Sequence, residues 1–246
     1  MIILGIIPAR YSSTRLPGKP LTDIAGKPMI QRVYESSAKS RLISKLLVAT
    51  DDNRIFDCVC GFGGNTILTS KKHKTGTDRI CEIISKIKSD IVVNIQGDEP
   101  NIYAGNIDSA IKPLLKDKKI DVSTLAIRMK NRHEINDANK VKVVIDSDNY
   151  AIYFSRSVIP YDRSKKSSIK YYKHIGLYVY RTDFLKIYQQ LRPGYSETAE
   201  NLEQLRILEN GYKIKVIITK KDSLSVDTPE DLKKIISLIK NKRIKI

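Results

Sequence analysis

The stretch that decides the fold is IILGIIPARYSSTRLPGKP, residues 2–20. It begins with a β-branched apolar run, residues 2–7, which is typical of a buried strand. The chain then enters a loop that holds three cations, Arg10, Arg15 and Lys19, among small and turn-forming residues. Ligands of open α/β sheets bind beyond the carboxyl ends of the strands. We therefore expect this loop to bind an anion.

The loop is not a P-loop, although Gly18 and Lys19 suggest one. That motif needs glycine where this chain has Ser13, and serine or threonine where it has Pro20. A phosphate would instead be held by side-chain cations and backbone N–H groups. A surface loop with incidental charges is the alternative that the sequence leaves open.

Apolar β-branched runs alternate with amphipathic stretches along the chain. Strands separated by helices of this length predict βαβ units, and hence an α/β fold with a mostly parallel sheet flanked by helices. The expected strands are residues 2–7, 46–49, 66–68, 91–95, 123–127, 141–145, 175–180 and 214–219, and the expected helices are residues 28–39, 52–62, 77–87, 106–115, 202–209 and those following Thr228.

The middle of the chain has a different character. Residues 122–180 are richer in strand patterns, and a helix–strand–helix pattern returns after them. We therefore expect one domain over residues 1–246, with the β-rich segment inserted within it.

The net charge and the cysteine content of the chain bear on its possible partners and location. The 246 residues carry a formal net charge of +17, which raises the possibility of a basic nucleic-acid-binding protein. The lysines are scattered, and we find no RNA-binding signature or paired Cys/His finger, so we expect no nucleic-acid partner. The chain has three cysteines without metal-ligand spacing and no long apolar run, and we expect no signal peptide. We expect a cytoplasmic protein with free thiols and no membrane insertion.

Two acidic positions are candidates for a metal site. In IVVNIQGDEPNI, residues 91–102, Asp98 follows an apolar strand, where a carboxylate can hold Mg²⁺. In SVDTPEDL, residues 225–232, Thr228 is placed to cap a helix, which leaves Asp227 for another task. A simple turn at Asp98, and a favourable helix dipole at Asp227, are the alternatives.

The β-rich segment supplies further polar candidates. In YYKHIGLYVYR, residues 171–181, His174 and Tyr178 are four apart and therefore share one face of a strand. A lone histidine is more often structural than catalytic. In YFSRSVIPY, residues 153–161, Arg156 is a plausible clamp for a carboxylate.

Taken together and in order, these motifs resemble the 3-deoxy-manno-octulosonate cytidylyltransferases, also called CMP-Kdo synthetases. The resemblance covers nearly the whole chain, from Ile6 to Leu232. The segments that carry it are IIPARYSSTRLPGKPL (6–21), VATDD (48–52), HKTGTDRI (73–80), VVNIQGDEP (92–100), IYFSRSVIPY (152–161), YKHIGLYVYR (172–181), LEQLRILENGY (202–212) and VDTPEDL (226–232).

The resemblance implies a nucleotide-diphospho-sugar transferase-like, Rossmann-like fold. It also implies a reaction, in which CTP and the sugar acid Kdo give CMP-Kdo and pyrophosphate for lipopolysaccharide biosynthesis. The anomeric hydroxyl of Kdo would attack the α-phosphate of CTP, with Mg²⁺ as the cofactor. A homodimer joined through the β-rich insert is implied as well.

The resemblance also assigns roles to individual residues. Lys19, Asp98 and Asp227 would be catalytic, and the two aspartates would hold the metal. The nucleotide would contact Arg10, Ser13, Arg15, Lys19, Arg79 and Gln96. The sugar acid would contact Arg156, His174, Tyr178, Glu203 and Gln204.

Two departures from the family pattern lie on the sugar side. Val179 stands where family members often carry glycine or alanine, and RPGYSETAE, residues 192–200, replaces the usual approach to the LEQLR helix. A related acid sugar, such as 8-amino-Kdo or a sialic-acid-like sugar, is therefore the alternative acceptor.

Overall fold

A computed structural model describes the chain except for residues 13–15, 74, 165–168 and 242–246. The chain divides into two compact units. The first unit consists of Met1–Asp108 and Asp222–Ile246, and the second consists of Ser109–Lys221. The expectation of one domain with an insert over residues 122–180 stays a prediction.

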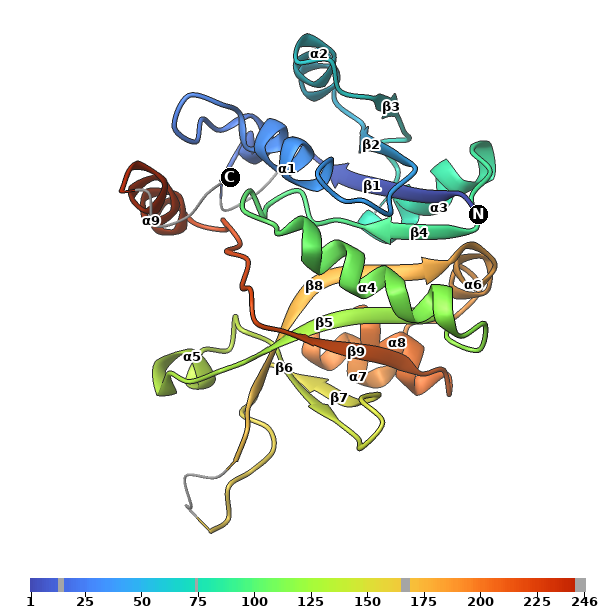
Figure 1. Ribbon diagram of the computed structural model, residues 1–246, viewed down its shortest axis with the longest axis vertical. Helices are drawn as coiled ribbons and strands as arrows, with labels where there is room; N and C mark the ends of the chain where they lie inside the picture. The colour runs from blue at the N-terminus through green and yellow to red at the C-terminus, as the bar shows by residue number, and fades with distance from the viewer. Residues whose placement is uncertain (13–15, 74, 165–168, 242–246) are drawn as a thin grey trace. The chain divides into compact units, whose positions relative to one another are not determined.

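The first unit contains a parallel sheet in which the strands lie side by side in the order β3-β2-β1-β4 (Figure 1). Because β2 and β4 both pair with β1, the strand order reverses there, and ligands of α/β sheets bind at such a point. The elements of this unit are β1 (Ile3–Ala9), η1 (Lys19–Leu21), α1 (Met29–Ser37), β2 (Lys45–Thr50), α2 (Asn53–Gly61), β3 (Thr66–Leu68), α3 (Gly76–Lys86), β4 (Ile91–Asn94) and α9 (Pro229–Lys240).

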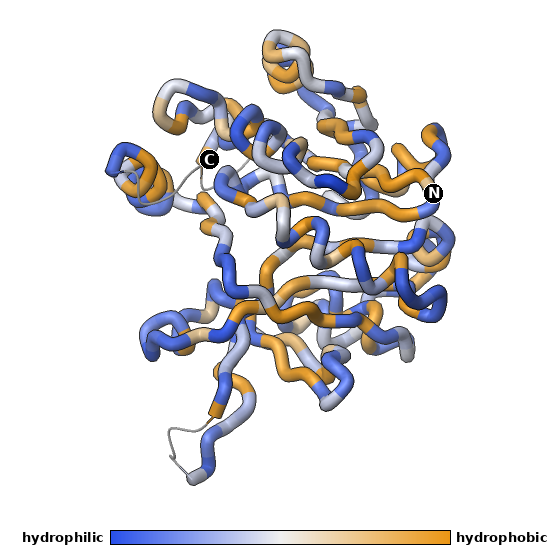
Figure 2. The backbone as a smooth tube through the Cα atoms, viewed as in Figure 1, coloured by the Kyte–Doolittle hydropathy of each residue, from blue (hydrophilic) through white to orange (hydrophobic). Residues whose placement is uncertain are grey.

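The core of the first unit follows from its apolar strands. Every residue of β4 is buried, as expected for a parallel strand with both faces covered. Figure 2 shows that hydrophobic residues are concentrated along β1, β2 and β4. The helix α9 begins with the capping box predicted from the sequence, in which Thr228 accepts from the N–H of Asp231 and the Asp231 carboxylate accepts from the N–H of Thr228.

The second unit is built around β5 (Val122–Arg128). This strand pairs parallel with β9 (Ile214–Thr219) and antiparallel with β8 (Tyr172–Arg181). A hairpin of β6 (Lys142–Ile145) and β7 (Ala151–Ser155) adjoins β8. The helices of this unit are α5 (Arg132–Asn136), α6 (Thr182–Tyr188), α7 (Tyr195–Glu200) and α8 (Gln204–Glu209), and α4 (Ala104–Lys116) crosses the boundary between the units.

The pairing of β5 with β8 contains a β-bulge. Thr124 pairs with Tyr178, and the next residue, Leu125, pairs with Ile175. The register therefore shifts by two residues of β8 at this step, across Gly176 and Leu177. Bulges bend a strand and redirect its side chains.

Two further features bear on the sequence-based expectations. In the described part of the chain, no helix combines the length and the apolar character needed to span a membrane. Cys58, Cys60 and Cys81 are free thiols, as expected from their spacing.

Candidate active site

Two glycines shape the loops at the point where the strand order reverses in the first unit. A Cβ on Gly97 would lie 2.9 Å from the carbonyl oxygen of Pro8, so the loop after β4 can pack against the end of β1 only with glycine there. Gly18 has a φ of 67°, in the left-handed region, and immediately precedes η1. These backbone features position Lys19 and Asp98.

The ammonium of Lys19 joins two carboxylates from distant parts of the chain. Its Nζ lies 2.7 Å from Oδ2 of Asp98 and 2.9 Å from Oδ1 of Asp227. Burial acts to lower the pKa of Lys19, but the two carboxylates outweigh it, and the pKa is raised above its ordinary value. The lysine is therefore charged at neutral pH, and it is shared by both aspartates.

The segment before α9 delivers Asp227 to this cluster. The backbone N–H of Val226 donates to the carbonyl of Asp98 at 2.9 Å, and Ser225 Oγ donates to Oδ2 of Asp227 at 3.1 Å. The capping box of α9 uses Thr228 and Asp231 and not the carboxylate of Asp227. The cap of α9 therefore does not need the side chain of Asp227, which instead contacts Lys19.

The donor set of the cluster fits a divalent cation. Asp98 and Asp227 already converge on one positive charge, and carboxylate oxygens are the ligands that Mg²⁺ prefers. No group of three or more His, Cys, Asp or Glu side chains is assembled as a metal site among the described residues. Mg²⁺ commonly takes one or two carboxylates and completes its shell with water and substrate phosphates, so two are sufficient.

The other residues predicted to contact the nucleotide have different settings. Arg10 is exposed directly after β1, and Gln96 is partly buried two residues after the end of β4. Ser13 and Arg15 lie outside the described residues. The structure therefore shows Lys19 in contact with the two carboxylates. The roles of Arg10, Ser13 and Arg15 in nucleotide binding stay predictions.

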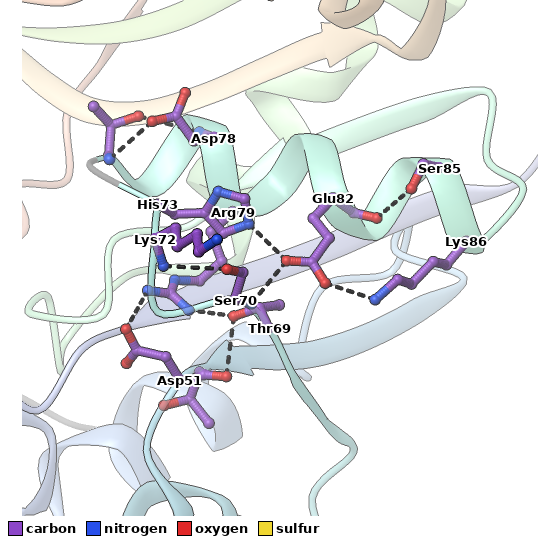
Figure 3. A network of polar contacts seen from close by, with 12 residues as sticks. Asp51, Thr69, Ser70, Lys72, His73, Asp78, Arg79, Glu82, Ser85 and Lys86 are labelled. Atoms are coloured by element: carbon purple, nitrogen blue, oxygen red, sulfur yellow. Dashed lines mark hydrogen bonds and ion pairs between the residues drawn. The ribbon is translucent and has the colours of Figure 1, made fainter.

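Arg79 is fully buried and occupies a polar network between α3 and the ends of β2 and β3 (Figure 3). Its Nη2 lies 2.8 Å from Oδ2 of Asp51, and its Nη1 donates to Oγ1 of Thr69. Asp51 lies at the carboxyl end of β2, a position that the strand-end rule could have identified. Arg79 thus joins three segments of the first unit.

Glu82 organises the neighbouring part of the same network (Figure 3). It contacts Nζ of Lys86 at 2.6 Å, the N–H of Ser70 at 2.9 Å and Nε2 of His73 at 2.6 Å. The hydrogen bond from Lys86, followed by that from Ser70, lowers the pKa of Glu82 to about 2. The segment after β3 is therefore fastened to α3 by an ionised carboxylate.

In the second unit, the bulge brings together two of the predicted sugar-site residues. Residues four apart in a regular strand are separated by roughly 13 Å, whereas the ring centroids of His174 and Tyr178 are 5.3 Å apart. Burial, followed by the charge of Lys173, lowers the pKa of His174 to about 3, so its imidazole is neutral. Burial likewise raises the pKa of Tyr178, although the nearby hydroxyl of Thr124 opposes this shift, and the Tyr178 hydroxyl forms no hydrogen bond of ordinary geometry with the described residues.

Arg156 lies directly after β7 and is bound to the end of α7. Its backbone N–H donates to Oε2 of Glu200 at 2.9 Å, and its Nε donates to the carbonyl of Glu200 at 2.8 Å. The carbonyl of Arg156 accepts from the ammonium of Lys142, which also donates to Asp137. Lys142 is buried inside β6, and nothing in the sequence pattern distinguished it from the other lysines.

Glu203 and Gln204 begin α8, and Gln204 is buried. Arg206, the third residue of α8, forms two contacts with the carboxylate of Glu197, of 2.8 and 2.6 Å. This hydrogen bonding raises the pKa of Arg206, and the guanidinium also lies over the ring of Tyr188. The pair fastens α8 to α7 and so holds the two predicted residues in place.

Comparison with known proteins agrees with this geometry. Residues 4–216 match the family model described as Cytidylyltransferase, so the chain is an enzyme of the nucleotidyltransferase class. It is 52% identical to a 3-deoxy-manno-octulosonate cytidylyltransferase of Geotalea uraniireducens over 98% of this chain and 100% of the relative. It is also 52% identical to that of Fusobacterium nucleatum over 100% of both chains. The chain belongs to the 3-deoxy-manno-octulosonate cytidylyltransferase family, as its motifs predicted.

Solved structures confirm the fold. The structure of a CMP:2-keto-3-deoxy-manno-octonic acid synthetase complexed with CTP superposes with a TM-score of 0.94 and 41% identity, over 98% of this chain and 100% of that chain. A 4-diphosphocytidyl-2C-methyl-D-erythritol synthase from Anaerococcus prevotii has a TM-score of 0.64 at 16% identity, over 97% and 98% of the two chains, and shares the fold alone. The predicted nucleotide-diphospho-sugar transferase-like fold is therefore confirmed.

Proposed function

We propose that the chain transfers the cytidylyl group of CTP to the anomeric hydroxyl of Kdo, which yields CMP-Kdo and pyrophosphate. The observation that carries the proposal is the convergence of Asp98 and Asp227 on one cation at the strand-order reversal. The full-length identity of 52% to enzymes of this name supports the choice of substrates. The proposed role is the supply of an activated sugar for lipopolysaccharide biosynthesis.

The first unit would hold the triphosphate. The attacked phosphorus is shielded by anionic oxygens, so catalysis depends on positioning and on neutralising charge. Lys19 would supply a fixed positive charge beside the reacting phosphate and would stabilise the departing pyrophosphate. Arg10, Ser13, Arg15, Arg79 and Gln96 are the other proposed nucleotide contacts. The interactions of Arg79 with Asp51 and Thr69 support an indirect role for that residue, in which it shapes the nucleotide side.

We propose Mg²⁺ as the cofactor, with Asp98 and Asp227 as its protein ligands. Bound there, the ion would neutralise phosphate charge and lower the pKa of the attacking hydroxyl. The ammonium of Lys19 contacts the same carboxylate oxygens, so it would have to share them or give them up. Lys19 would thereby keep the two carboxylates in position before the substrates bind.

The second unit would hold the sugar acid through Arg156, His174, Tyr178, Glu203 and Gln204. The buried hydroxyl of Tyr178 supports this, because a buried polar group without a partner is rare in proteins and a sugar hydroxyl could pair with it. Arg156 would meet the carboxylate. A homodimer and a cytoplasmic location complete the proposal, and the free thiols support a reducing compartment.

An acceptor panel tests the proposed reaction. The protein would be incubated with CTP, Mg²⁺ and either Kdo, 8-amino-Kdo or sialic acid, and pyrophosphate release would be measured. We expect release with Kdo that needs all three components. Faster release with 8-amino-Kdo or sialic acid would identify a different acceptor for the same chemistry. No release with any acceptor from folded protein would rule out the proposed activity.

A further inference from the structure

Thr124, a residue of β5 that no motif identified, contacts three groups on β8 around the bulge. Its Oγ1 lies 2.8 Å from the carbonyl of Leu177, 3.3 Å from the carbonyl of Ile175 and 3.0 Å from Nε2 of His174. The side chain is buried. A single hydroxyl thus connects the bulge backbone to the histidine of the predicted sugar site.

The chemistry of these groups determines where the protons lie. A carbonyl oxygen can only accept, and a threonine hydroxyl has one proton to donate. We assign the proton of Thr124 to the carbonyl of Leu177, the nearest of the three groups at 2.8 Å, and the oxygen of Thr124 then accepts from Nε2–H of His174. In the neutral imidazole the other nitrogen, Nδ1, then carries only a lone pair.

The surroundings of His174 maintain this state. The rings of Phe154 and Tyr178 lie 5.1 and 5.3 Å from the imidazole, and neither ring carries a charge at neutral pH. The charged group that acts on the imidazole is Lys173, which together with burial opposes protonation. His174 nevertheless keeps part of its surface exposed, and the hydrogen bond that its ring forms with Thr124 uses Nε2 and not Nδ1.

We propose that Thr124 is a positioning residue that locks His174 in the Nε2–H form, so that Nδ1 accepts a hydrogen bond from a hydroxyl group of the sugar acid. The inference rests on the proposed function, because the sugar acid is the ligand in question. A carboxylate cannot donate to a lone pair, so this histidine recognises the polyol part of the acceptor. The carboxylate of the acceptor then has to be bound elsewhere, for which Arg156 is the proposed group.

Nitrogen NMR of the histidine rings tests the lock without reference to turnover. The chain has three histidines, so substitutions of His73 and His133 by glutamine assign the signals. We expect His174 to show a protonated Nε2 and a bare Nδ1, unchanged from pH 5 to pH 8. A proton on Nδ1, or titration in this range, would overturn the proposal even if the enzyme proves to use another acceptor.

Substitution of Thr124 then tests the consequence for recognition. Thr124→Val keeps the shape of the side chain and removes the hydroxyl, so we expect mixed tautomers and a KM for Kdo about tenfold higher, since a lost hydrogen bond costs roughly 1 kcal/mol or more. We expect Thr124→Ser to restore both the tautomer and the KM, and the KM for CTP to stay within about twofold. Thr66→Val is the matched control, because Thr66 also donates to a strand carbonyl but lies in the first unit.

The outcomes separate the two proposals. An unchanged tautomer and an unchanged KM for Kdo in Thr124→Val would overturn the lock while leaving the reaction intact. No turnover of Kdo by the unsubstituted enzyme would overturn the reaction, and the ring signals would still decide the tautomer. If Thr124→Val fails to fold, the signals of the unsubstituted protein and of Thr124→Ser decide.

Discussion

The candidate sites of the two units differ in electrostatic character. In the first unit, the ammonium of Lys19 forms ion pairs with the partly exposed carboxylates of both Asp98 and Asp227. In the second unit, His174 is kept neutral by burial and by a hydrogen bond to Thr124. The contrast agrees with the proposed ligands. A triphosphate with its metal is bound by charged groups, whereas the hydroxyl groups of a sugar are bound by directed hydrogen bonds.

The largest effect that would test this contrast is expected at the charged cluster. Asp98→Asn or Asp227→Asn keeps the size of the side chain but removes one of the two carboxylates. We expect turnover in the pyrophosphate-release assay to fall by about 10³-fold, because transition-state charge would lose its preorganised partner.

The matched control for this experiment is Asp57→Asn, an exposed position on α2. It removes the same charge from the protein and should keep near-normal turnover. If either site variant turns over as fast as the control, the cluster is structural and the contrast between the units fails.

A second test asks whether Arg79 belongs to the charged site or to the scaffold. Arg79→Met removes one partner of a buried ion pair and leaves Asp51 without its cation. We expect the free energy of unfolding to fall by about 3 kcal/mol, since breaking a buried pair from one side is strongly destabilising. Urea denaturation followed by circular dichroism measures this.

Arg41→Met, at an exposed arginine, is the control and should change the unfolding free energy by less than about 0.5 kcal/mol. If Arg79→Met is as stable as this control but no longer binds CTP, Arg79 contributes to nucleotide binding and not to the stability of the unit.

The smallest effect concerns Glu82 and its dependence on pH. Its pKa in the folded protein is about 2, below the ordinary value of 4.5, so its contribution to stability is present above about pH 5 and is lost as the pH falls toward 2. Because the partner Lys86 is 55% exposed, solvent screens the interaction. We expect Glu82→Gln to lower the free energy of unfolding by about 1 kcal/mol at pH 7.

Urea titrations of Glu82→Gln between pH 2 and pH 7 would measure this difference, with Glu230→Gln, at an exposed residue, as the control. The difference from the unsubstituted protein should shrink as the pH falls. A constant difference across this range would show that Glu82 stabilises the unit by contacts that do not depend on its charge.

The sequence was most informative where function depends on strand ends. An apolar run followed by turn-forming and charged residues identifies β1 and β4, and Lys19 and Asp98 lie in the segments that follow these strands. The capping box of α9 could also be predicted from the sequence, because the residues that form it lie within four consecutive positions.

Contacts that depend on tertiary pairing could not be predicted. Thr124 contacts His174 only because a bulge shifts the register between β5 and β8, and no local sequence pattern predicts that shift. The contact of Arg79 with Asp51 could not be predicted either, because it joins residues that are 28 positions apart in the sequence. The short helices α5 to α7 also went unpredicted, since five to seven residues carry too little periodicity to be distinguished from loops.

The bridge made by Lys19 has a consequence for the synthesis of the chain. It links residues that are 79 and 208 positions apart, and the backbone of Val226 and Leu224 adds contacts with Asp98 and Asn101. A ribosome releases these partners in order, so the first strands can pair long before Asp227 emerges. Until it does, Lys19 and Asp98 can form only half of the cluster. The enzyme therefore acquires its complete charged site late in translation, after most of its fold has had time to form.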